Sequence, residues 1–167
     1  MELFAIGVLI GLAVLVVFYR RRRGLAAPVL GRAGDPGRKR HDIEAALHAL
    51  STRRNDDAFV FLEDVRTRKY VQFGGGEGRP ILFDLPAMAL KPEEMKRAVA
   101  YFEALGRGSL ETFDVAKREG GVPIDRGETY QIRFSPEEAA RAAEVALEVF
   151  ERVYRLPADF TLAIDEN

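Results

Sequence analysis

The stretch from Lys69 to Leu85, KYVQFGGGEGRPILFDL, places two alternating segments on either side of a glycine-rich connection. Residues 69–73 and 80–85 are rich in β-branched and aromatic side chains, and apolar residues recur at every second position. The connection Gly74–Arg79 is short enough to close a hairpin between them. The sequence therefore predicts two antiparallel strands here.

Further elements are expected on both sides of this hairpin. Residues 58–63 (AFVFLE) predict a preceding strand, and a helix capped by Asp42 is expected before it, because apolar residues recur there at helical spacing. A second helix begins near Pro92, which suits the first helical turn; Met95, Val99 and Phe102 are expected on its inner face, and Gly106 is expected to end it. The last helix begins at the capping box of Ser135 and Glu138.

Residues 110–117 and 128–134 predict a second hairpin, although the first of them could instead form one helical turn. Residues 160–164 either add a short final strand or pack against the core. The predicted fold class is therefore α+β: a domain of the order α-β-β-β-α-β-β-α with an antiparallel sheet.

The N-terminal residues predict an addition to this fold, a single transmembrane helix. Residues 3–19 form an unbroken apolar run, which at about 1.5 Å per residue spans roughly 25 Å. A cleaved secretory signal would carry its positive charge before such a run, whereas here four arginines follow it. By the positive-inside bias these arginines orient the chain: Arg20, Arg21, Arg22 and Arg23. The expectation is a single-pass protein of the inner membrane that contacts lipid through residues 3–19, with its N-terminus outside and its domain cytoplasmic.

Composition divides the chain into an anchor (1–23), a flexible linker (24–40) and an α+β domain (41–167). Residues 1–40 hold eight Lys and Arg against two acidic residues, and residues 41–167 hold 17 against 24. An acidic domain is a poor candidate for binding nucleic acid. The chain contains no cysteine, which excludes disulfides and thiolate metal sites.

We find no catalytic signature, and neither an enzyme activity nor a cofactor is expected. A phosphate-binding glycine loop leads into a helix, but a strand follows Gly74–Gly78. The two histidines, His41 and His48, lack companion ligands at metal-site spacing. The serines lie outside any recognisable nucleophile motif.

Two stretches resemble the type III secretion chaperone-like superfamily, including its bacterial branch that is not tied to secretion. They are the strand Lys69–Phe73 and the closing segment Phe150–Leu162, FERVYRLPADFTL. The likeness covers residues 42–164. It implies an α+β domain that dimerises and binds a protein segment along its exposed surface without a cofactor. The chain differs from the secretion chaperones in its predicted transmembrane anchor.

The function expected from the sequence is a membrane-tethered adaptor or regulator that binds another polypeptide, through edge-strand addition or through an apolar segment docked on the sheet. Candidate partner-binding residues are Tyr70, Gln72 and Phe73, although alternating aromatic residues favour the core for Tyr70 and Phe73. Two alternatives remain. One is a small-molecule-binding or enzymatic domain that uses Gly74–Arg79 and Asp84, and the other is a structural subunit of a membrane complex.

Overall fold

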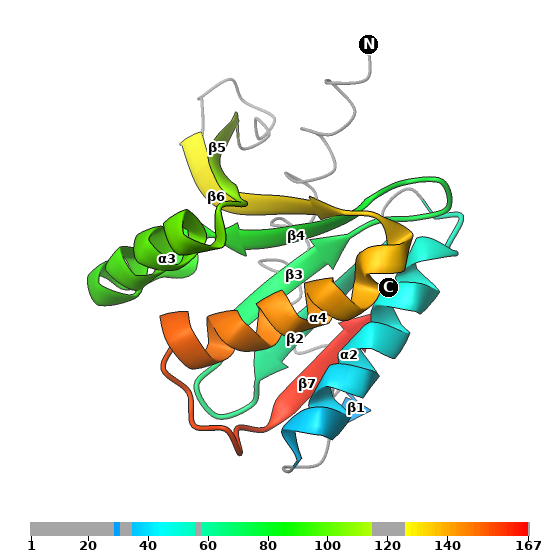
Figure 1. Ribbon diagram of the computed structural model, residues 1–167, viewed down its shortest axis with the longest axis horizontal. Helices are drawn as coiled ribbons and strands as arrows, with labels where there is room; N and C mark the ends of the chain where they lie inside the picture. Colours follow the sequence, from blue (N-terminus) through cyan, green and yellow to red (C-terminus); the bar gives the residue numbers. More distant parts are fainter. Residues whose placement is uncertain (1–28, 31–34, 56–57, 115–125, 167) are drawn as a thin grey trace, which may run out of the picture.

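The glycine-rich hairpin lies in the middle of an antiparallel sheet with the strand order β1-β7-β2-β3-β4-β6-β5 (Figure 1). The computed structural model describes residues 29–30, 35–55, 58–114 and 126–166. Within these ranges the strands are β1 (Val29–Leu30), β2 (Phe59–Asp64), β3 (Tyr70–Gly74), β4 (Ile81–Pro86), β5 (Ser109–Asp114), β6 (Arg126–Phe134) and β7 (Leu162–Glu166).

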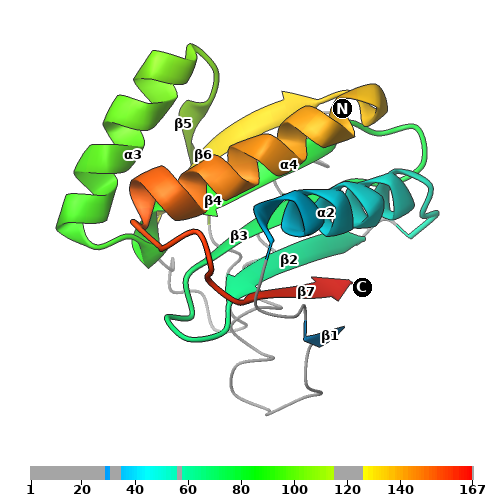
Figure 2. The same cartoon turned by 60° about the horizontal axis from the view of Figure 1, so that its bottom comes forward.

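All the described α-helices lie on one face of the sheet (Figure 2). They are α2 (Pro36–Ser51), α3 (Pro92–Leu105) and α4 (Ala139–Glu148). Three short helical segments adjoin them: the 3-10 turns η1 (Ala87–Ala89) and η2 (Pro136–Glu138), and the π-helical turn η3 (Val149–Val153), which continues α4. We call the opposite side of the sheet the open face, because none of the described helices covers it.

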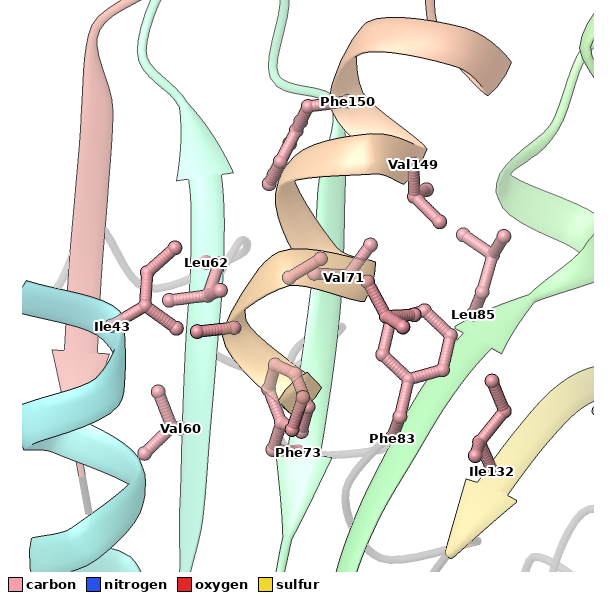
Figure 3. Packing of buried hydrophobic residues seen from close by; sticks show 14 of the residues in the cluster. Ile43, Val60, Leu62, Val71, Phe73, Phe83, Leu85, Ile132, Val149 and Phe150 are labelled. Carbon is pink, nitrogen blue, oxygen red and sulfur yellow. The ribbon is translucent and has the colours of Figure 1, made fainter. Parts of the chain in front are cut away.

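The core fills the space between the sheet and the helices (Figure 3). From the sheet, alternate strand residues such as Val71, Phe73 and Phe83 point into it, and all three are fully buried. From the helices, Ile43 of α2 and Phe150 of η3 pack down on them and are also fully buried. Burying such a side chain contributes about 2 kcal/mol, so this layer holds the helices on the sheet.

Local signals explain where two of the helices begin. Ser135 and Glu138 form the predicted capping box before α4, and the main-chain N–H of Ser135 donates to Glu138 Oε2 at 2.8 Å. Helix α3 begins at Pro92, and Glu94 Oε2 accepts the N–H of Lys91 at 2.8 Å. Left-handed Gly106, with φ 62°, ends α3 as expected.

The first helix begins earlier than predicted. Its N-cap is Asp35 rather than Asp42, and Pro36 occupies the first turn, so residues 36–40 of the expected linker are helical. Lys39, expected in that linker, is 5% exposed and its Nζ donates to the carbonyl of Ala158 at 2.7 Å. Basic residues with glycine and proline look like a linker by composition, but here an Asx cap and a buried lysine stem start a helix.

Residues 160–164 and the described part of residues 110–117 contribute strands rather than packing segments or a helical turn, while residues 115–117 lie outside the described residues. Strand β7 pairs with β2 along its whole length, from Val60 opposite Glu166 to Asp64 opposite Leu162. Strand β5 pairs with β6, from Ser109 opposite Gln131 to Asp114 opposite Arg126. The domain is therefore α+β with an antiparallel sheet, as predicted.

The predicted transmembrane part of the fold requires a correction. None of the helices in the described ranges is both long enough and apolar enough to cross a membrane. This finding overturns the single-pass fold class and the inner-membrane location expected from the sequence. The predicted span at residues 3–19 and the orienting Arg20, Arg21, Arg22 and Arg23 lie outside the described residues.

Candidate binding surface

The centre of the open face carries a hydrogen-bonded polar cluster. Asp84 of β4 stands between Gln72 of β3 and Gln131 of β6, which are its direct cross-strand neighbours. The amide of Gln72 donates to Asp84 Oδ2. The hydroxyl of Thr129 donates to Oδ1, and so does Gln131 Nε2 at 3.4 Å. We call these four residues the Asp84 cluster.

Burial governs the charge of Asp84. Its side chain is 3% exposed, and this desolvation raises the pKa of the carboxyl group above its ordinary value of 3.8. The three donors favour the ionised form and oppose that change, while the carboxylate of Glu111 adds to it. Burial therefore makes ionisation of Asp84 costly, while three hydrogen-bond donors stabilise the carboxylate when it is charged.

One acceptor in this cluster is not used by any described residue. Gln131 is 4% exposed, and its Oε1 accepts no hydrogen bond within the described ranges, although its Nε2 donates to Asp84. A buried amide oxygen without a partner costs about 1 to 3 kcal/mol. A hydrogen-bond donor placed next to Gln131 Oε1 would remove this cost.

The three predicted partner-binding residues lie on different sides of the sheet. Phe73 faces the helices and is fully buried in the core, edge-on to Phe83 with 5.4 Å between ring centroids. Gln72 points to the open face and belongs to the Asp84 cluster. Tyr70 also points to the open face, half-buried, with its ring 4.8 Å from that of Phe61. Strand alternation separates Phe73 from the other two.

A different set of residues presents apolar surface to solvent. Among the described residues, the exposed large hydrophobic side chains are Met88 in η1, Val99 in α3 and Leu110 in β5. Val99 is 41% exposed, which corrects its predicted place in the buried face of its helix. Helix α3 and strand β5 lie at the same end of the sheet (Figure 1).

Tyr130 of β6 connects these positions. Leu110 is its cross-strand partner, and the Phe102 ring of α3 stacks on its ring at 4.5 Å between centroids. The hydroxyl of Tyr130 lies 3.7 Å from Met95 Sδ, and Met95 lies one helical turn before Val99. Turn η1, which carries Met88, contacts β6 as well. We call Met88, Val99 and Leu110, with the edge strand β5, the β5-end surface.

The glycine-rich connection is held by the segment between α2 and β2. The N–H of Glu77 donates to the Arg53 carbonyl at 2.7 Å, and the N–H of Gly75 donates to the Ala58 carbonyl at 3.3 Å. A Cβ on Gly76 would lie 3.2 Å from the Arg53 oxygen. Since these N–H groups are already bonded to carbonyls, the alternative of a phosphate-binding loop gains no support from this geometry.

Residues for metal binding do not converge in the described part of the chain. It contains no group of three or more His, Asp or Glu side chains able to hold a metal ion. His41 and His48 are both exposed on α2, and His48 Nε2 lies 3.8 Å from Glu44 Oε1. Ser135 serves as a helix cap.

No family model, curated protein or solved structure matches this chain. The resemblance to the type III secretion chaperone-like superfamily therefore stays a prediction made from Lys69–Phe73 and Phe150–Leu162.

Sequence reasoning did not identify the Asp84 cluster or the β5-end surface. The first has a partial signal: Gln72 and Asp84 are polar residues inside otherwise apolar strands, whereas Gln131 lies in a strand of mixed character. The second has little signal, because an exposed valine at helical spacing has the same pattern as a buried one.

Proposed function

We propose that this domain binds an extended segment of another polypeptide at the β5-end surface and acts as a chaperone-like adaptor or regulator. The observation that carries the proposal is the presence of exposed apolar side chains beside a sheet edge. Strand β5 ends the sheet order, and no described strand pairs with its outer side. An edge strand can form main-chain hydrogen bonds with an added strand of almost any sequence.

The neighbouring side chains determine which segment fits. Leu110 is 47% exposed on β5, so an added strand with alternating apolar residues would bury it, and Met88, 63% exposed, offers further apolar surface. Methionine is suited to such a surface, because its unbranched side chain adapts to partners of different shape. This favours a polypeptide partner over a polar metabolite. The resemblance to chaperone-like proteins supports the same class of partner and adds the expectation of a homodimer.

The experiment is a selection of displayed, unstructured peptides against the full chain, followed by calorimetric titration of each enriched peptide. Leu110→Asp and Val99→Asp should weaken binding at least about tenfold, because each places a charge in an apolar contact. Arg38→Asp is the matched control, since Arg38 is exposed on α2, which packs against β2 and β7 on the other side of the sheet from β5. Its affinity should stay within about twofold of the original.

Hydrogen exchange on the same complexes locates the contact. The amides of β5 should become protected when peptide binds, because the added strand supplies them with acceptors. The proposal fails if no enriched peptide binds saturably, or if binding is insensitive to both aspartate variants. A stabilising shift caused by a nucleotide or metabolite, without peptide binding, would instead favour the small-molecule alternative.

A further inference from the structure

Two carboxylates lie beside the β5-end surface, at the end of the sheet where α3 stands (Figure 2). Glu103 is exposed on α3, one turn after Val99. It follows Phe102, whose ring stacks on that of Tyr130. Glu128 is exposed on β6, two residues before Tyr130, and therefore lies on the same face of the sheet. We call Glu103 and Glu128 the acidic pair.

The hydroxyl of Tyr130 responds to both members of the acidic pair. Burial raises the pKa of this hydroxyl, and the charges of Glu128 and Glu103 raise it further. One carboxylate comes from a helix and the other from a strand, so the fold brings them to the same hydroxyl from separate parts of the chain. Negative charge is therefore concentrated next to exposed apolar side chains.

Basic side chains nearby do not neutralise the acidic pair. Lys96 of α3 pairs with Glu93, with 2.7 Å between Nζ and Oε1. Arg107, which follows the helix, pairs with Glu138 at 3.2 Å. Among the described residues, no ion pair or side-chain hydrogen bond involves either carboxylate of the acidic pair. Both charges are therefore available to a cation from another molecule.

Apolar surface and negative charge adjoin each other at this end of the sheet. Leu110 is the cross-strand partner of Tyr130, and Glu128 is opposite position 112, so Leu110 and Glu128 are diagonal neighbours. Such neighbours lie about 7 to 8 Å apart, within reach of a long side chain. A lysine or arginine on a strand added to β5 can lay its aliphatic stem on Leu110 while its charged head reaches a carboxylate.

The same charges disfavour other occupants of this edge. A second copy of the chain would add two further carboxylates to the contact, and an acidic segment would also meet charge of its own sign. Like charges brought together across an interface suppress the wrong partner. The acidic balance of residues 41–167, with 17 Lys and Arg against 24 Asp and Glu, acts in the same direction.

We propose that the β5-end surface binds cationic segments in preference to neutral or acidic ones. The fitting segment is extended and carries a lysine or arginine two residues from an apolar residue, because residues two apart share one face of a strand. The apolar residue packs on Leu110, and the cation binds Glu103 and Glu128. This inference rests on the proposed function, since it names the charge of the peptide that the surface binds.

Three synthetic peptides test this preference against the full chain. All have threonine at every second position, so that one face of the strand carries threonine alone. On the other face, valine alternates with lysine in the first peptide, with glutamine in the second and with glutamate in the third. Fluorescence anisotropy should give the lysine peptide about fivefold higher affinity than the glutamine peptide, and the glutamate peptide should bind weakest. Added salt should remove the advantage of lysine.

Variants of the chain locate the effect. Glu103→Gln combined with Glu128→Gln should weaken binding of the lysine peptide about fivefold, and should change the affinity of the glutamine peptide less than about twofold. Glu77→Gln is the matched control, because Glu77 is an exposed carboxylate in the connection before β4. Strand β4 reaches Thr129, the neighbour of Glu128, only at its other end. The control should leave both affinities within about twofold.

The outcomes separate this inference from the proposed function. Equal affinities for the lysine and glutamine peptides, or a preference for lysine that survives in the double variant, would overturn the inference and leave peptide binding intact. The same holds if peptides enriched by display bind while none of these three does. If no peptide of either kind binds, both fail. Self-association of the chain that competes with the lysine peptide would show that a second copy occupies the edge, and would also overturn the inference.

Discussion

The ammonium group of Lys69 lies 2.7 Å from the carboxylate of Glu94, and this ion pair joins the start of β3 to the first turn of α3. The side chains are 17% and 8% exposed. Glu94 also accepts the N–H of Lys91. Burial opposes the charged carboxylate, but the bonds from Lys69 and Lys91 outweigh it and lower the pKa of Glu94.

Lys69→Met should lower the free energy of unfolding by about 3 kcal/mol, because it leaves a mostly buried carboxylate without its cation. The double variant Lys69→Met/Glu94→Gln should be more stable than Lys69→Met alone, since the glutamine carries no charge. Urea titrations at neutral pH measure both values. A double variant that is no more stable than the single one would contradict this explanation.

The same pair predicts a pH dependence. A lowered folded-state pKa means that the stabilisation is complete above the ordinary pKa of 4.5 and is lost as the pH falls towards the lowered value. The native chain should therefore lose stability below about pH 4.5 more steeply than Glu94→Gln does. If the free energies of unfolding of the two proteins fall in parallel with decreasing pH, the pKa of Glu94 is not lowered by folding.

Asp84 should affect the pH dependence of stability in the opposite direction. Because burial raises its folded-state pKa, ionisation costs stability as the pH rises above 3.8 through that raised value. Asp84→Asn should thus gain stability relative to the native chain as the pH rises from about 4 to 7. Asp84→Leu should lose about 2 kcal/mol or more, since it leaves the donors of Gln72, Thr129 and Gln131 without an acceptor. Thermal unfolding across this pH range separates the two variants.

The hairpin offers a matched pair of glycine substitutions. Gly76 has φ +153°, and an added Cβ would lie 3.2 Å from the Arg53 carbonyl oxygen, whereas a Cβ on Gly74 would meet nothing within 4 Å. Gly76→Ala should therefore cost more than about 1 kcal/mol, and Gly74→Ala should be neutral or stabilising. Chemical denaturation of the two variants measures both changes in the free energy of unfolding. Equal effects would show that the loop adjusts freely against α2.

Helix α3 offers a second matched pair, one turn apart. Phe102 is 3% exposed and stacks on Tyr130, whereas Val99 is 41% exposed. Phe102→Ala should cost about 3 to 5 kcal/mol, and Val99→Ala should cost within about 0.5 kcal/mol. Equal losses would mean that α3 is rotated relative to the sheet.

Elements with a strong local signal could be predicted from the sequence. Alternation identified β4, and Ile81, Phe83 and Leu85 are all fully buried on the helix face. The Ser135 capping box identified the start of the last helical segment. These predictions hold because each depends on residues within one turn or one strand of each other.

The errors come from information that lies elsewhere in the chain. The start of α2 was placed too late because Lys39 reads as a solvated linker residue, and its partner Ala158 lies 119 positions away. Val99 was placed in the buried face because its helical spacing from Met95 and Phe102 is that of a core residue, whereas in the folded domain it is 41% exposed. The Asp84 cluster requires the register of three strands, which one sequence does not supply.

The place of β7 has a consequence for how the protein is made. The last strand of the chain lies between β1 and β2, which come from its beginning. While a ribosome is still translating residues 162–166, the flank of β2 that they will occupy has no neighbour from that strand. The nascent sheet is therefore open at that flank until residues 162–166 have been translated, so truncations that remove these residues are expected to release chains prone to strand-mediated self-association.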